Sequence, residues 1–145
     1  KDGWPTLAST RGKAMFVMLN SGHHRDNYLK DHPNLEDRVL FARGGQGQPW
    51  SAVLEMGSPT SDLTKIQDAV KAGYLVRTKA DSPENDDATN TKKAAAAIAS
   101  GAHLISCDRP VPHENSPWKF DLPGGTPSRC NPLVAPKNCT SGDIE

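Results

Sequence analysis

The sequence predicts an α/β domain with a parallel sheet, and two observations lead to this fold class. A nearly continuous apolar run at residues 13–19 is typical of a strand covered on both faces, as strands of parallel sheets are. Further along, a helical segment, a glycine and a short apolar strand follow one another twice, with Gly73 and Gly101 28 residues apart. Helices that alternate with short apolar strands at this spacing indicate consecutive βα units.

Short apolar runs bounded by glycine or polar residues predict four strands. They are Lys13–Leu19, Val39–Ala42, Tyr74–Arg77 and Ala102–Ser106. Residues 52–54 form one more apolar patch, which fits a strand or a loop equally well. Residues 4–7 are expected to open a short helix before the first strand. In the polar segment 23–38, Pro33 would interrupt any helix.

The first of two predicted helices precedes the strand at Tyr74. Ser61 is its expected N-cap, and Asp62 lies in the first turn, where a carboxylate meets the positive end of the helix. Its apolar face is formed by Leu63, Ile66 and Val70.

The second predicted helix covers residues 88–100 and follows Asp86 and Asp87. Its alanine-rich body has high intrinsic helix propensity. Gly73 and Gly101 stand just after the two helices, where glycine is the preferred residue.

Beyond Asp108 the apolar periodicity stops, and residues 110–145 are expected to form an irregular tail rich in proline and glycine. Cys130 and Cys139 lie nine positions apart in this tail, a spacing that a disulfide can close. The alternative is two free thiols. Asn138 begins the triplet Asn-Cys-Thr, which fits the N-glycosylation pattern. A disulfide and a glycosylation site together predict a secreted protein.

Composition excludes some classes of function for the 145-residue chain. Its 17 basic and 17 acidic side chains balance, which argues against binding nucleic acid or anionic membranes through bulk charge. No apolar run approaches the roughly 18 residues of a transmembrane helix. With 35% hydrophobic residues, many of them alanine, the expected core is small.

Polar residues follow each predicted strand, at the edge of a parallel sheet where ligands bind. The candidate site residues are Asn20, Arg77, Lys79 and Asp108, with Arg43 after the second strand. Side chains alternate along a strand, so Arg77 and Lys79 should project to the same side and suit a phosphate. The alternative is a pair of solvated cations, or cations paired with Asp81 or Asp108.

Other motifs carry less chemistry. His23 and His24 are adjacent, should point in different directions, and lack metal ligands at typical spacing, so a surface-loop pair is expected. His103 is expected to be a hydrogen-bonded interior or interface residue. The glycine-rich run at 44–47 lacks the ending of a phosphate-binding loop.

Several blocks, in this order, resemble the C-terminal half of the calcium-dependent phosphoinositide-specific phospholipase C family, within the superfamily of PLC-like phosphodiesterases. The match is carried by Gly3–Leu7, Arg11–Lys13, Gly73–Asp81, Ala99–Ala102, Ile105–Asp108 and Arg129–Pro132. One departure is Cys107, which stands where the family pattern has a threonine.

The resemblance implies a TIM-type barrel and a secreted enzyme that cleaves a phosphodiester with bound Ca²⁺. A substrate hydroxyl would attack phosphorus, with two histidines as acid and base. In this superfamily those histidines and most calcium ligands lie on the first strands, so the catalytic residues are expected outside this chain. No metal ligand is assignable to it.

A full barrel takes about 250 residues, so this chain would supply about half of one, in about four βα units. Residues 1–109 are the expected half-barrel, and residues 110–145 the tail packed on it. The expected partners are a phosphodiester or phospholipid substrate and the N-terminal half of the same barrel, in one polypeptide or after a proteolytic nick.

Four alternatives stay open. The chain could fold with closed edges or dimerise to complete the barrel. It could also be a non-catalytic binding or scaffold module, or belong to a phosphodiesterase acting on glycerophosphodiesters.

Overall fold

Parallel strands form the framework of the computed structural model, which describes residues 3–144. They are β1 (Val17–Met18), β2 (Phe41–Ala42), β3 (Val53–Glu55), β4 (Leu75–Lys79) and β5 (Leu104–Ser106). β1 pairs with β2, and β3, β4 and β5 form a three-stranded sheet in that order, with every pair parallel. The predicted α/β class with parallel pairing is therefore confirmed.

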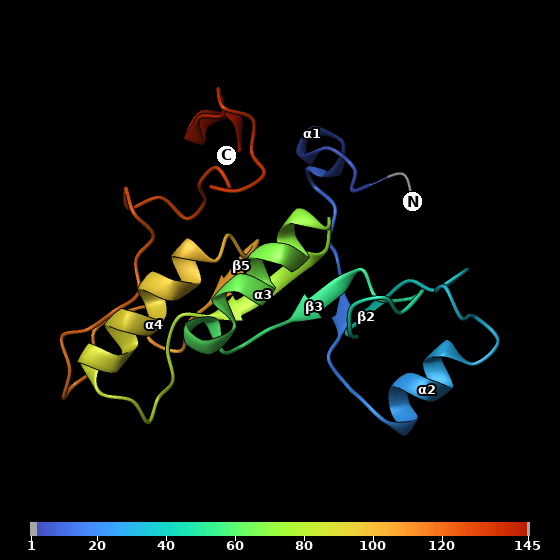
Figure 1. Cartoon of the computed structure of the whole chain (residues 1–145), viewed down its shortest axis with the longest axis horizontal. Coiled ribbons are helices and arrows are strands. Elements are labelled where there is room, and N and C mark those ends of the chain that lie inside the picture. Colours follow the sequence, from blue (N-terminus) through green and yellow to red (C-terminus); the bar gives the residue numbers. More distant parts are fainter. Residues whose placement is uncertain (1–2, 145) are drawn as a thin grey trace.

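The pairing continues from one sheet to the other. Arg43 and Val53 form a parallel bridge, and the backbone N–H of Gly44 donates to the carbonyl of Val53 at 3.4 Å. The strands thus lie side by side in the order in which they occur along the chain (Figure 1). The ambiguous patch at 52–54 contributes β3, whose partner on β4 decides its strand conformation.

Strand lengths differ from the sequence prediction. The run Lys13–Leu19 yields only the two residues of β1, because β2 offers just Phe41 and Ala42 as partners. β4 is longer than predicted and extends to Lys79, since β5 pairs with it as far as Ser106.

α3 (Pro59–Lys71) begins earlier than predicted. Ser58 occupies the N-cap position and Pro59 the first helical position, which suits proline because its missing N–H has no acceptor there. Ser61 is therefore not the N-cap; its hydroxyl donates to the Ser58 carbonyl at 3.2 Å. Asp62 has non-helical angles (φ −110°, ψ 19°), so the helix is kinked at the point where the sequence suggested its start.

α4 (Asp87–Ala99) agrees with the sequence prediction within one residue at each end. The Asp86 carboxylate accepts a hydrogen bond from the backbone N–H of Thr89 at 2.7 Å and caps the helix. Gly73 and Gly101 follow α3 and α4 with positive φ angles of 88° and 68°, which glycine adopts without a steric penalty.

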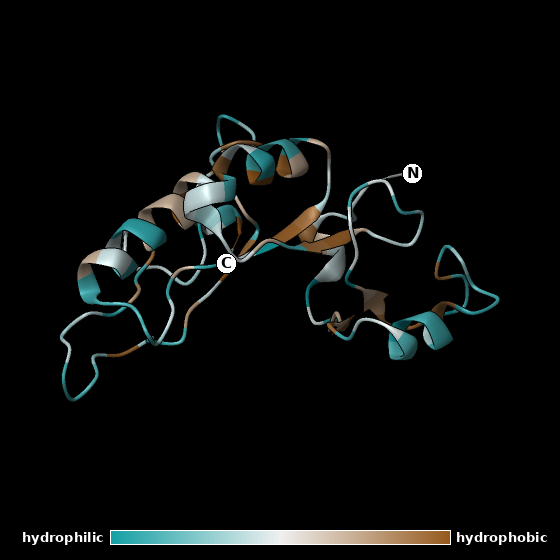
Figure 2. Cartoon of the chain, turned by 60° about the horizontal axis from the view of Figure 1, so that its bottom comes forward, coloured by the Kyte–Doolittle hydropathy of each residue, from teal (hydrophilic) through white to brown (hydrophobic). Residues whose placement is uncertain are grey.

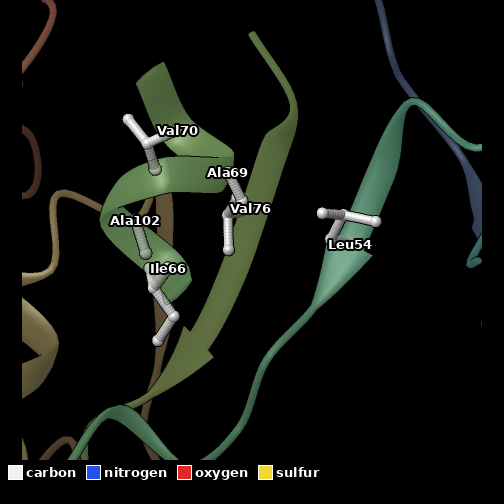
Figure 3. Packing of buried hydrophobic residues seen from close by; sticks show 6 residues of the cluster. All are labelled: Leu54, Ile66, Ala69, Val70, Val76 and Ala102. Atoms are coloured by element: carbon white, nitrogen blue, oxygen red, sulfur yellow. The ribbon is translucent and has the colours of Figure 1, made fainter. Parts of the chain in front are cut away.

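The hydrophobic core lies between α3 and the three-stranded sheet (Figure 3). Its buried members are Leu54, Ile66, Ala69, Val70, Val76 and Ala102, with Met56, Tyr74 and Leu133 packed around them. Leu133 comes from the tail. Its Cδ1 lies 2.6 Å from the position that a Cβ would occupy on Gly101, so the tail packs directly on this turn.

Two shorter helices lie outside this core. α1 (Leu7–Thr10) is the helix expected after residues 4–7, and the Thr6 hydroxyl accepts from the Ser9 N–H at its start. α2 (His23–Leu29) ends before Pro33. Neither helix buries a residue. α2 lies at the opposite end of the molecule from α4 (Figure 1), and its ribbon is mostly hydrophilic (Figure 2).

The tail is irregular apart from a short 3₁₀ turn, η1 (Ser141–Asp143). Cys130 and Cys139 form the predicted disulfide. The Arg129 guanidinium donates to the Ile98 carbonyl at 3.0 Å, and the Asn131 amide donates to the Gly101 carbonyl at 2.7 Å. These bonds hold the tail against the carboxyl end of α4. The division of the chain at residue 109 stays a prediction.

Within residues 3–144, no helix combines the length and the apolar character needed to cross a lipid bilayer.

Candidate functional site

Arg77 and Lys79 lie on the same face of β4. Burial alternates along this strand: Val76 and Thr78 are fully buried, while Leu75, Arg77 and Lys79 are half-buried. Val76 belongs to the core beneath α3, so Arg77 and Lys79 face away from that helix. The two residues lie at different levels along the strand, because Arg77 pairs in register with Glu55 and Leu104, whereas Lys79 pairs with Ser106.

The structure brings Lys79 and Asp108 together. The Lys79 Nζ lies 3.2 Å from the Asp108 carboxylate, and about a third of the lysine side chain is exposed. This ion pair spans the ends of β4 and β5. Asp108 is one of the two carboxylates that the sequence analysis suggested as partners for Arg77 and Lys79.

The backbone at Asp108 is fixed by a buried carboxylate. Asp81 is fully buried, and its two oxygens accept from the backbone N–H groups of Asp108 (2.8 Å) and Arg109 (2.9 Å). Asp81 therefore does not pair with the cations; it holds the segment that follows β5. This role depends on two adjacent residues that lie 27 and 28 positions from Asp81 along the chain.

A second network holds the loop between β4 and α4. The buried Asn90 accepts from the Ser82 N–H at 3.1 Å and donates to the Ser82 carbonyl at 3.2 Å. The Lys93 ammonium donates to the Asp81 carbonyl at 3.0 Å and to the Ser82 hydroxyl at 2.7 Å. The loop beside Lys79 is thus ordered by side chains of α4.

Arg77 is paired with a carboxylate that the sequence analysis did not single out. Its Nη1 donates to Glu55 Oε1 at 2.5 Å, and the other carboxylate oxygen accepts from Arg43 Nη1. The bond from Arg43, the charges of both guanidiniums and the bond from Arg77 together hold the pKa of Glu55 below its ordinary value, against an opposing effect of burial. Glu55 follows residues 52–54, so assigning that patch to a strand would have placed Glu55 at a strand end.

The Asn20 side chain is not hydrogen-bonded to this cluster. Asn20 lies after β1 and is exposed, and within residues 3–144 its side chain makes no hydrogen bond. The structure therefore groups Arg77, Lys79 and Asp108 and adds Arg43 and Glu55, whereas no hydrogen bond within residues 3–144 joins the Asn20 side chain to them.

The histidine predictions need correction. His23 and His24 are exposed as expected, but they form the first turn of α2 and not a loop, and their rings lie close together, with centroids 3.7 Å apart and planes tilted by 40°. His103 is hydrogen-bonded as expected, since its Nδ1 accepts from the Val76 N–H at 3.3 Å, but the residue is exposed and not interior. Removal of water from the ring lowers the pKa of His103, which favours the neutral imidazole.

Cys107 follows β5 and carries a free thiol. Burial, together with the nearby charges of Asp81 and Asp108, raises the pKa of this thiol. A thiol that stays protonated near neutral pH is a poor nucleophile. The surroundings of Cys107 therefore favour a packing role.

Calcium requires about six to eight oxygen ligands. Among residues 3–144, no three His, Cys, Asp or Glu side chains gather closely enough to hold a metal ion. The carboxylates at the strand ends are already engaged: Glu55 by two arginines, Asp81 by backbone N–H groups and Asp108 by Lys79. The described part of the chain does not fit a calcium site of its own.

Comparison with known families gives one finding. The sequence model of the family described as "Phosphoinositide phospholipase C, Ca2+-dependent" matches residues 1–132, most of the chain. No curated protein and no solved structure matches the sequence. The match covers both the strand-end cluster and most of the tail, and it agrees with the resemblance seen in the sequence blocks. The chain therefore belongs to the family of Ca²⁺-dependent phosphoinositide phospholipases C.

Proposed function

We propose that this chain contributes the phosphate-binding side of a secreted phosphodiesterase that acts on phosphoinositides. The observation that carries the proposal is the pair Arg77 and Lys79 on one face of β4, in a chain that belongs to this family. A guanidinium offers a planar fork for two phosphate oxygens, and an ammonium adds a compact charge.

Both cations keep donors for a ligand. Within the described residues, Arg77 uses only Nη1 in a side-chain hydrogen bond, and Lys79 has one carboxylate neighbour at 3.2 Å. A guanidinium has five N–H donors and an ammonium has three. A phosphoryl group would take the remaining donors, while Asp108 holds Lys79 in place.

The proposed reaction is attack of a substrate hydroxyl on phosphorus, with loss of the bond to the leaving group. One histidine would take the proton of the hydroxyl and a second would protonate the leaving oxygen. These histidines, and the calcium ligands, would come from a segment preceding Lys1. Arg77 and Lys79 would neutralise charge on the non-bridging oxygens as it develops.

We also propose that the strands form part of a TIM-type barrel completed by that preceding segment. Two observations support this. The strands are parallel and in sequence order, with α3 packed against the face of the sheet that holds the core. Near the other face a hollow is left between the strands and the tail, lined by Leu75, Arg77, Leu104, Phe120 and Val134.

The barrel proposal is tested by the size of the natural protein. We expect an intact mass near twice 15.6 kDa, or a tightly bound second chain that carries two histidines. A native 15.6 kDa species without a partner chain would instead support a binding module.

Secretion is a further part of the proposal. The disulfide Cys130–Cys139 supports an oxidising compartment, and Asn138 in the Asn-Cys-Thr triplet is exposed. Expression through a eukaryotic secretory pathway should give a product whose mass falls on treatment with a glycosidase. The variant Asn138→Gln should show no such change. An unglycosylated wild-type product would remove this support.

The activity test measures calcium-dependent release of inositol phosphate and of glycerol phosphate by the intact protein. Arg77→Ala and Lys79→Ala should each lower kcat/KM for inositol phosphate release by about 10²–10³-fold, as loss of one charge-stabilising donor does. Lys65→Ala, which removes an exposed lysine paired with Asp62 on α3, is the matched control and should keep full activity. Unchanged activity of both site variants would refute the assignment, and release of glycerol phosphate alone would change the substrate.

A further inference from the structure

Glu55 is shared by two arginines from different strands. Its Oε1 accepts from Arg77 of β4, and its Oε2 accepts from Arg43, the residue after β2. β3 lies between β2 and β4, and Figure 1 shows β2 and β3 as neighbours. One carboxylate at the end of the middle strand thus holds a guanidinium on each side.

The cluster keeps a net positive charge. In the ion pairs within residues 3–144, the three cations Arg43, Arg77 and Lys79 meet two carboxylates, Glu55 and Asp108, which leaves one positive charge in excess among the paired groups. The side chains of Arg43 and Arg77 are 37% and 29% exposed, so a ligand can reach them. An anion is therefore the ligand that the charge of this cluster favours.

The ion pairs also restrict the arginine side chains before any ligand binds. An arginine side chain carries about 2 kcal/mol of rotamer entropy, and a guanidinium held at one nitrogen keeps its other donors in a fixed plane. Within the described residues, Arg43 and Arg77 each use a single nitrogen in side-chain hydrogen bonds, both to Glu55. Groups fixed in this way bind a ligand at a lower entropic cost.

We propose that Glu55 is a positioning residue that holds Arg43 and Arg77 as a two-guanidinium clamp on the phosphoryl group, with Arg43 as a further ligand-contacting side chain. This inference rests on the proposed function, which already assigns Arg77 and Lys79 to the phosphate. It adds a third cation from another strand. It also gives Glu55 a role that charge alone does not explain, because a carboxylate by itself repels a phosphate.

Two changes at Glu55 separate geometry from charge. Glu55→Gln removes the negative charge and leaves one acceptor oxygen in place of two, so Arg43 and Arg77 can no longer each bind an oxygen of its own. Glu55→Asp keeps the charge but is one methylene shorter, so it cannot reach both guanidiniums. In the intact protein, we expect each variant to lower kcat for inositol phosphate release by about 10- to 100-fold, as misplacement of a binding group does.

Binding of inorganic phosphate provides the second measurement. By isothermal titration calorimetry, Glu55→Gln should bind phosphate about as tightly as the wild type, because the positive charge that the cluster gains offsets the entropic advantage that the released guanidiniums lose. A lower kcat without weaker phosphate binding is the signature of lost positioning. A role limited to charge would give tighter binding, unchanged kcat and a wild-type Glu55→Asp variant, and that result would overturn the proposal.

Arg43 is tested separately. Arg43→Ala should lower kcat/KM by at least about tenfold, and Arg43→Lys should restore little of it, because lysine lacks the planar fork. Asp62→Asn and Arg25→Ala break ion pairs elsewhere and serve as controls with wild-type kinetics. At the assay temperature every variant must be folded, with the circular dichroism spectrum of the wild type and a melting transition that begins well above that temperature. If Glu55→Gln does not fold, the kinetics of Arg43→Ala and Arg43→Lys decide whether the proposed clamp is right.

The outcomes distinguish this inference from the proposed function. In one outcome Arg77→Ala loses activity, while the kcat/KM of both Glu55 variants and of Arg43→Ala stays within about twofold of the wild-type value. A twofold change is too small to indicate a lost contact, so the clamp would be wrong and the proposed function would stand. If Arg77→Ala is fully active, or the wild type neither cleaves the substrate nor binds phosphate, the proposed function fails and the clamp fails with it.

Discussion

The strands β3–β5 and the strands β1–β2 use the same parallel pairing, yet they bury very different amounts of apolar surface. In the first region α3 covers the sheet, and Leu54, Ile66 and Val76 are at most 3% exposed. In the second region Phe16, beside β1, is 64% exposed, and Val39, before β2, is 89% exposed. α2 follows β1 but buries no residue.

The difference shows that the helix decides how well a parallel strand is buried. α3 places Ile66, Ala69 and Val70 on one face, so it can pack on β4. α2 is only seven residues long, with the sequence HHRDNYL, and offers no comparable apolar face. A strand without such a helix needs another covering element, which the proposed barrel would supply for β1.

Truncation of the core gives the largest expected contrast between the two regions. Ile66→Ala should lower the free energy of unfolding by about 2–5 kcal/mol, because Ile66 is fully buried. Phe16→Ala should change it by about 0.5 kcal/mol or less, as exposed substitutions do. Urea unfolding of both variants, with unchanged m-values, checks this. A loss at Phe16 as large as that at Ile66 would mean that Phe16 is covered in the intact protein.

The turns after α3 and α4 give an intermediate effect and show how much the tail adds to the first region. Alanine in place of either glycine would have to adopt a positive φ, which costs about 1 kcal/mol or more of stability. Nothing lies within 4 Å of a Cβ on Gly73, whereas Leu133 would be 2.6 Å from one on Gly101. Gly101→Ala should therefore cost about 1–3 kcal/mol more than Gly73→Ala, the usual cost of overpacking.

Thermal unfolding of the two glycine variants measures this difference. The double variant Gly101→Ala/Leu133→Ala is the control, since it removes the clash and leaves the strained φ. If Gly73→Ala and Gly101→Ala lower the stability equally, the tail moves away from Gly101 without a cost in free energy.

The smallest effect concerns Glu55, whose two arginines link the two regions. The pKa of Glu55 is lowered in the folded protein, chiefly by its bond to Arg43. Its contribution to stability is therefore present above the ordinary glutamate value and is lost as pH falls through the lowered one. The wild type should melt at a higher temperature than Glu55→Gln at pH 7, and the gap should close as pH falls well below 4. A constant gap would contradict this ionic contribution.

Local features of the sequence predicted much of the fold. Asp86 as a cap, the alanine-rich body of α4 and the two glycines fix their elements through residues within one turn, so α4 and the starts of β4 and β5 were placed closely. The start of α3 was misplaced, because a serine and an aspartate at 61–62 resemble a cap while Pro59 begins the helix. The extent of β1 was also overestimated, because a strand ends where its partner does.

The candidate site was predicted in part for the same reason. Alternation along a strand placed Arg77 and Lys79 on one face, and Asp108 was already a suggested partner. Glu55 and the buried Asp81 were missed as site residues, because their roles depend on residues 12 to 28 positions away.

The amino-acid sequence by itself determined the class of fold, the succession α3, β4, α4 and β5, and the family, since caps, periodicity and motif blocks are local properties. The tertiary structure alone decided which carboxylate meets which cation. That choice depends on strand register and on the approach of β2, β3 and β4, which brings Arg43 and Arg77 to the two oxygens of Glu55. No spacing along the chain encodes that meeting, because a few ångströms of register shift would pair other charges.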